Sequence, residues 1–106
     1  NAPLHGGAED KDIVGAFEGK LLPALKTFKP DLVLISAGFD SRKDDTLGDC
    51  KVTDDGFKKL TQIMMDIAEK HCHSRLVSVL EGGYNLKGLG LATDTHLKTL
   101  LEYKKS

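Results

Sequence analysis

Two short apolar segments without polar alternation constrain this chain more than any other feature of its sequence. Residues 31–36 contain "LVLI", and residues 75–80 read "RLVSVL". A strand with one face in water alternates apolar and polar side chains, whereas a strand covered on both faces is apolar at nearly every position. We therefore expect two strands that are buried on both faces.

The segments around these strands have helical periodicity. Thr53, followed by two aspartates, fits the start of a helix, because Thr is favoured at the N-cap and acids are favoured in the first turn. One further helix is expected before the first strand and one after the second, and Pro23 predicts a kink or break near residues 21–22. The apolar faces comprise Ile13, Phe17, Leu21, Leu25 and Phe28, then Phe57, Leu60, Ile63, Met64, Ile67 and His71, then Leu86, Leu89, Thr93, Leu97 and Leu100.

The order helix, strand, helix, strand, helix predicts an α/β fold. We expect a parallel βαβ sheet with a right-handed crossover and helices on both faces, as a single domain over residues 1–106. Ligands of parallel sheets bind beyond the carboxyl ends of the strands. The loops that begin near Asp40 and Glu81 are therefore the candidate site.

Composition narrows the function classes. The formal net charge is −1 and the basic residues are scattered, so nucleic-acid binding is not expected. No apolar run approaches the ~18 residues of a membrane helix, and the first residues lack the pattern of a signal peptide. Cys50 and Cys72 are too few for a disulfide framework and suit a reducing compartment, so a cytoplasmic location is expected.

Asp40 directly follows the first strand, and Asp44 and Asp45 come within five residues of it. A carboxylate at a strand end either caps a turn or serves as a hard oxygen ligand of a metal. The residues alone leave both alternatives open. The loop lacks the mid-loop Gly and terminal Glu of a calcium-binding loop, so a self-contained calcium site is not expected.

Tyr84 lies in "EGGYN", just after two glycines. Its ring either packs over the sheet with the hydroxyl in water, or the hydroxyl donates into the strand-end crevice and stabilises a developing oxyanion. The loop resembles a phosphate-binding loop only in its glycine interval, because no Lys-Ser or Lys-Thr follows Gly88. The triplet His71 to His73 is helical by pattern, so its side chains diverge and cannot all reach one metal.

Three segments in order, "KPDLVLISAGFD", "DDTLGDCKVTDDGF" and "VLEGGYN", resemble the C-terminal part of the histone deacetylase and acetylpolyamine amidohydrolase family, in particular its bacterial and class II branches. The resemblance implies part of the arginase/deacetylase fold and zinc-dependent hydrolysis of an N-acetyl amide. By position, Asp40 matches the third zinc ligand and Tyr84 matches the tyrosine that hydrogen-bonds the acetyl carbonyl. Gly82 and Gly83 match the turn beside the acetyl-lysine channel. Thr46 stands where the family commonly has Pro after the acid at Asp45.

The resemblance also implies that the general acid and base histidines and two other zinc ligands lie upstream of these residues. The triplet Asp94 to His96 has the Asp-x-His form but falls in the last expected helix. We therefore expect the C-terminal portion of a zinc-dependent deacetylase acting on acetyl-lysine or acetylpolyamine, inactive as this isolated chain. Zinc and an acetylated amine substrate are expected only in a complete enzyme.

The alternative is a non-catalytic, self-associating α/β module derived from the same fold. Two strands alone leave unpaired edges, which are templates for pairing with another chain. Two-fold pairing is the commonest closed arrangement of identical subunits. A homodimer is therefore expected, unless the lead-in or the "CKV" segment pairs with the strands.

Overall fold

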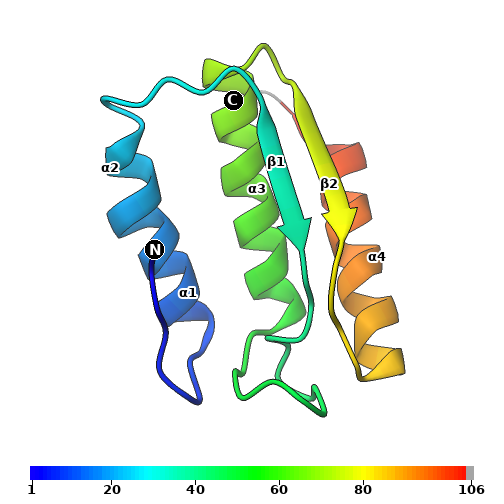
Figure 1. Cartoon of the computed structure of the whole chain (residues 1–106). Helices are drawn as coiled ribbons and strands as arrows, with labels where there is room; N and C mark the ends of the chain where they lie inside the picture. The colour runs from blue at the N-terminus through cyan, green and yellow to red at the C-terminus, as the bar shows by residue number, and fades with distance from the viewer. Residues whose placement is uncertain (105–106) are drawn as a thin grey trace.

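A computed structural model describes residues 1–104 as a two-stranded parallel sheet packed against helices (Figure 1). Strand β1 (Val33–Ala37) pairs with β2 (Leu76–Leu80), with Val33 opposite Leu76 and Ala37 opposite Leu80. Helix α3 (Asp54–His71) connects the strands, and α4 (Leu86–Glu102) follows β2. The predicted α/β class and its parallel βαβ unit are confirmed.

The helical region before β1 is divided into three parts. Helix α1 (Asp10–Ala16) continues into the π-helical turn η1 (Phe17–Leu21) and the short α2 (Leu22–Ala24). Pro23 has no N–H to donate to the preceding turn, so a regular α-helical pattern cannot run through it. At the predicted place the helix is not broken but changes locally, into a widened turn in which the Leu22 N–H donates to the Phe17 carbonyl.

The start of α3 confirms the predicted cap. The Thr53 hydroxyl accepts a hydrogen bond from the Gly56 N–H at 3.2 Å. The Asp10 carboxylate in turn accepts from the Thr53 N–H at 2.7 Å and from the Thr53 hydroxyl. Because Asp10 is the first residue of α1, this contact fastens the starts of two helices to each other.

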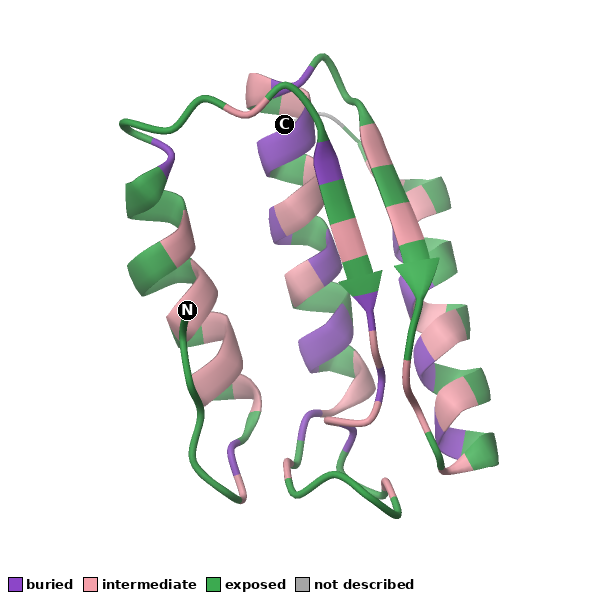
Figure 2. Cartoon of the chain, in the orientation of Figure 1, coloured by how far each residue is buried: buried purple, intermediate pink, exposed green. Residues whose placement is uncertain are grey.

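The helices lie on one face of the sheet, and the expectation of helices on both faces is not met within residues 1–104. Helices α3 and α4 pack against each other, and α1 packs against α3. On the other face, which we call the outer face, Leu34, Val77 and Val79 are 68%, 48% and 55% exposed (Figure 2). The apolar pattern marks side chains that avoid water, but it does not say whether the covering element belongs to the same chain.

Within residues 1–104, the sheet contains only β1 and β2, so each strand has one unpaired edge. The lead-in and the "CKV" segment do not fill these edges. Glu9 instead forms an isolated bridge with Lys51, and Arg42 forms one with Val52. None of the helices in this part of the chain is long and apolar enough to cross a membrane.

The inner face carries a buried histidine between the sheet and both long helices. His96 Nδ1 lies 2.8 Å from the Thr61 hydroxyl, and Nε2 lies 2.9 Å from the Ser78 hydroxyl. Thr61 donates its own proton to the Phe57 carbonyl at 2.7 Å, so Nδ1 is the nitrogen that donates to Thr61. Burial lowers the pKa of His96, which favours the neutral ring in the folded chain.

This histidine predicts a loss of stability in mild acid. Because the unfolded chain binds a proton at His96 that the folded chain resists, the free energy of unfolding should fall as the pH drops below about 6.5. Urea unfolding at pH 7.5 and 5.5 measures this, and each unit of pKa difference is worth about 1.4 kcal/mol. His96→Gln should reduce the difference between the two pH values. Equal pH dependence in the two proteins would contradict the assignment.

Candidate functional site

The loops that follow β1 and β2 lie side by side at the carboxyl ends of the strands, as the parallel pairing predicts (Figure 1). The Glu81 N–H donates to the Ala37 carbonyl at 3.0 Å, and the Phe39 N–H donates to the Gly82 carbonyl at 2.8 Å. The Phe39 ring is buried beneath the first loop, with its centroid 5.1 Å from that of Phe57. Both loops are thus joined to each other, and the first is anchored in the core.

Asp40 and Tyr84 meet over Gly82. A methyl group built on Gly82 would lie 2.9 Å from an Asp40 carboxylate oxygen and 3.1 Å from the Tyr84 hydroxyl. The two functional groups therefore point into the same small space, which is open only because residue 82 has no side chain. Asp40 is partly buried and Tyr84 is 49% exposed, so this space adjoins solvent.

The Asp40 carboxylate does not cap the turn in which it lies. The Arg42 N–H donates to the Phe39 carbonyl at 3.2 Å, and Asp40 is the second residue of this turn. Among the hydrogen bonds described for residues 1–104, none reaches the Asp40 carboxylate. No described hydrogen bond supports the capping alternative, and the role of Asp40 as a zinc ligand stays a prediction.

Gly83 has a structural requirement of its own. Its φ of +141° lies in a region that side chains disfavour, and a methyl group on it would come within 2.7 Å of a Leu89 methyl group. Gly83 therefore lets the second loop pass close to α4. The structure places Gly82 and Gly83 beside Asp40 and Tyr84, while their contact with substrate stays a prediction.

Arg42 supports the first loop, and it was not identified from the sequence. It is only 7% exposed, and its guanidinium donates to the Asp54 carboxylate at 2.9 and 3.1 Å and to Asp44 at 3.4 Å. Hydrogen bonding to Arg42 lowers the pKa of Asp54, and Asp54 raises the pKa of Arg42. The bridge ties the loop after β1 to the first turn of α3. The sequence feature that could have predicted this bridge is an arginine in the loop after a strand, followed by a helix that begins with two aspartates.

The other candidate groups do not form a site. The Cys72 thiol is buried and donates to the Pro30 carbonyl at 3.3 Å, whereas His73 is exposed. Within residues 1–104, no three His, Cys, Asp or Glu side chains are arranged to hold a metal ion. His96 of the Asp-x-His triplet is in the core, where both ring nitrogens have hydroxyl partners.

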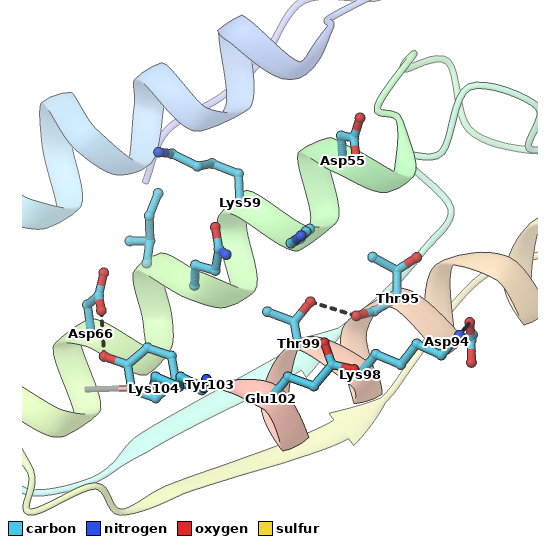
Figure 3. A pocket seen from close by; sticks show the side chains of 13 residues that line it. Asp55, Lys59, Asp66, Asp94, Thr95, Lys98, Thr99, Glu102, Tyr103 and Lys104 are labelled. Carbon is cyan, nitrogen blue, oxygen red and sulfur yellow. Dashed lines mark hydrogen bonds and ion pairs between the residues drawn. The ribbon is translucent and has the colours of Figure 1, made fainter. Parts of the chain in front are cut away.

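A cavity of about 690 Å³ lies in a groove between α3 and α4 (Figure 3). Within it, Lys98 pairs with Asp94 at 2.9 Å, and the Tyr103 hydroxyl donates to Asp66 at 2.5 Å. None of the predicted site residues lines it. The candidate site at the strand ends is therefore distinct from this groove.

Comparison with known proteins decides the family. The model described as the histone deacetylase domain matches residues 1–100. The chain belongs to the histone deacetylase family. Histone deacetylase 15 of Arabidopsis thaliana is 42% identical over 96 residues, which cover 91% of this chain and 17% of that protein. Histone deacetylase HDA1 of Saccharomyces cerevisiae is 38% identical over 96 residues, covering 91% of this chain and 13% of that protein.

A solved structure agrees with this assignment. The crystal structure of the HDA15 HD domain aligns with the whole chain at a TM-score of 0.87 and 39% identity, but the alignment covers only 29% of that domain's chain. This deacetylase-family chain therefore spans less than a third of the length of these relatives. It is part of a histone deacetylase domain, as the three sequence motifs implied.

The close approach of Gly48 to Asp40 provides a test of the site geometry. A methyl group on Gly48 would overlap the Asp40 backbone carbonyl oxygen, so Gly48→Ala must displace the loop after β1. We expect the free energy of unfolding to fall by about 1–3 kcal/mol. Gly90→Ala in α4 is the matched control, since nothing lies near its added methyl group, and it should stabilise by about 0.5–1 kcal/mol. Equal effects in urea unfolding would contradict the loop geometry.

Proposed function

We propose that this chain is the C-terminal portion of a zinc-dependent deacetylase-type hydrolase that cleaves the N-acetyl amide of acetyl-lysine or an acetylpolyamine. The observation that carries the proposal is the meeting of the Asp40 carboxylate and the Tyr84 hydroxyl over Gly82 at the carboxyl ends of both strands. Membership of the histone deacetylase family supports it. In this proposal, Asp40 would help to hold the metal that polarises the acetyl carbonyl, and Tyr84 would donate a hydrogen bond to the oxygen of the same carbonyl.

Asp40 fits the role of a metal ligand because its carboxylate is a hard oxygen donor that no described protein donor engages. Zinc bound in a complete domain would supply a water of lowered pKa and a Lewis acid for the acetyl carbonyl. One carboxylate cannot complete a site of three protein ligands. We propose that the remaining ligands and the general base come from the rest of a complete domain, and that the isolated chain holds zinc only weakly.

Tyr84 contributes a hydrogen-bond donor. Its phenol can donate to the acetyl oxygen as negative charge develops there, and such a bond is stronger in the transition state than in the ground state. Half of the side chain is exposed, so a substrate can reach the hydroxyl from solvent. We propose that the acetyl group enters the space that the absent side chain of Gly82 leaves beside this hydroxyl, and that Gly83 completes the turn next to it.

A chimaeric domain tests the assignment directly. The chain would replace the matching segment of the HDA15 HD domain, to which it aligns over its full length. We expect hydrolysis of an acetyl-lysine peptide and retention of zinc after desalting. Tyr84→Phe should lower kcat by about 10²–10³-fold with unchanged zinc content, as loss of one oxyanion donor does. Asp40→Asn should lower the zinc content.

Tyr103→Phe is the matched control, because this second tyrosine bonds Asp66 and Glu69 at the groove between α3 and α4. It should leave kcat and zinc content unchanged. Circular dichroism establishes that each variant folds. A Tyr84→Phe chimaera with full kcat, or an Asp40→Asn chimaera with full zinc content, would refute the assigned roles.

A second candidate function rests on the outer face of the sheet. This face exposes Leu34, Val77 and Val79 between two unpaired strand edges. We propose that in the isolated chain a second copy covers this face, as a non-catalytic, self-associating module. A formal net charge of −1 means that two copies repel each other little. Open edges and apolar area then favour two-fold pairing.

Self-association is measured by size exclusion with light scattering at micromolar concentrations. The mass should approach twice 11.5 kDa and should fall on dilution. Val77→Lys should yield a monomer because it places a charge in the contact. Leu101→Lys is the control, since Leu101 is 85% exposed on α4 and away from the sheet face. A monomer mass that is independent of concentration would exclude the module.

A further inference from the structure

The loop after β1 holds the loop after β2 through hydrogen bonds to the backbone of Tyr84 and to the side chain of Asn85. The Tyr84 N–H donates to an Asp45 carboxylate oxygen at 2.7 Å. The side-chain amide of Asn85 donates to the backbone carbonyl of Asp44 at 2.9 Å, and the Thr46 hydroxyl lies 3.5 Å from the Tyr84 carbonyl oxygen. Residues almost forty positions apart in the sequence are thus fixed to one another.

Asp45 is the side chain that serves both loops. Its second carboxylate oxygen accepts from the Leu47 N–H at 2.9 Å and from the Gly48 N–H at 2.8 Å, which closes its own loop and fixes the carboxylate. Desolvation by itself raises the pKa of Asp45, but the backbone donors of Gly48, Tyr84 and Leu47 outweigh it and lower the pKa. The carboxylate therefore remains charged and a strong acceptor at neutral pH.

The side chain of Tyr84 does not fix its own position. It is 49% exposed, so packing around the ring is incomplete. The next residue, Asn85, is committed to the start of α4, because its side chain accepts from the Gly88 N–H at 2.8 Å. The backbone bond at Tyr84 is then the contact that sets where the ring leaves the loop.

We propose that Asp45 is a positioning residue for Tyr84: its carboxylate holds the Tyr84 backbone so that the hydroxyl reaches the space over Gly82, opposite Asp40. The catalytic meaning of this arrangement rests on the proposed function, while the positioning itself is a property of this chain. Thr46 assists, since its hydroxyl lies near the Tyr84 carbonyl.

Amide hydrogen exchange of the whole chain, followed by NMR, tests the proposal without any catalysis. Asp45→Ala should raise the exchange rate of the Tyr84 N–H on the order of tenfold or more and should shift the Tyr84 ring signals. Asp44→Asn is the control, because that carboxylate is 61% exposed and contacts only Arg42, and Tyr84 should not change. Faster exchange confined to Leu47 and Gly48, with Tyr84 unchanged, would overturn the proposal.

Asp45→Asn keeps the test decisive if the alanine variant fails to fold. Its single amide oxygen cannot serve both loops, and it should stay with the two donors of its own loop and release Tyr84. Unchanged exchange at Tyr84 together with unchanged exchange at Leu47 and Gly48 would overturn the proposal, because one amide oxygen would then serve both loops.

The chimaeric domain separates positioning from a general loss of structure. Asp45→Asn should lower kcat with zinc content retained, and it should have little further effect in a Tyr84→Phe background, because it acts through that residue. Equal effects in the two backgrounds would show that Asp45 acts independently of Tyr84. A chimaera without any activity would count against the proposed function, whereas the exchange result would still decide the role of Asp45.

Discussion

Parallel pairing of β1 with β2 requires the carboxyl ends of both strands to lie at the same end of the sheet, and the arrangement of the candidate site depends on that requirement. Asp40 and Tyr84 are 44 positions apart, and α3 lies between them in the sequence. An antiparallel pair would place them at opposite ends of the strands. The register that sets Ala37 opposite Leu80 instead brings the two loops into hydrogen-bonding distance.

The two faces of the sheet differ in how far they are buried. The inner face is covered by Phe39, Phe57 and His96, whose two ring nitrogens each have a hydrogen-bond partner. These residues hold α3 and α4 against the strands. The outer face leaves apolar side chains in contact with water. A complete domain, or a second copy of the chain, would gain free energy by removing this area from water. The candidate site therefore lies at the end of a sheet whose inner face is buried by the helices and whose outer face is exposed.

Much of this arrangement could be predicted because it depends on residues that are close together in the sequence. Both strands, the Thr53 cap and the local change of the helix before Pro23 follow from periodicity and from the chemistry of single residues. The motif resemblance identified Asp40 and Tyr84 as partners. The single-sided helix layer and the role of Asp45 could not be predicted in this way, because each depends on contacts between distant segments: α3 with α4, and a carboxylate with the Tyr84 N–H 39 residues later.

The central claim is that the strand-end loops hold the Tyr84 hydroxyl over Gly82, opposite the Asp40 carboxylate. Nuclear Overhauser contacts in the labelled chain measure this geometry directly. The account predicts contacts between the Tyr84 ring protons next to the hydroxyl and the Gly82 α protons, because the hydroxyl lies 3.1 Å from a methyl position on Gly82. A Tyr84 ring without contacts to Gly82, and with the signals of a free tyrosine, would contradict it.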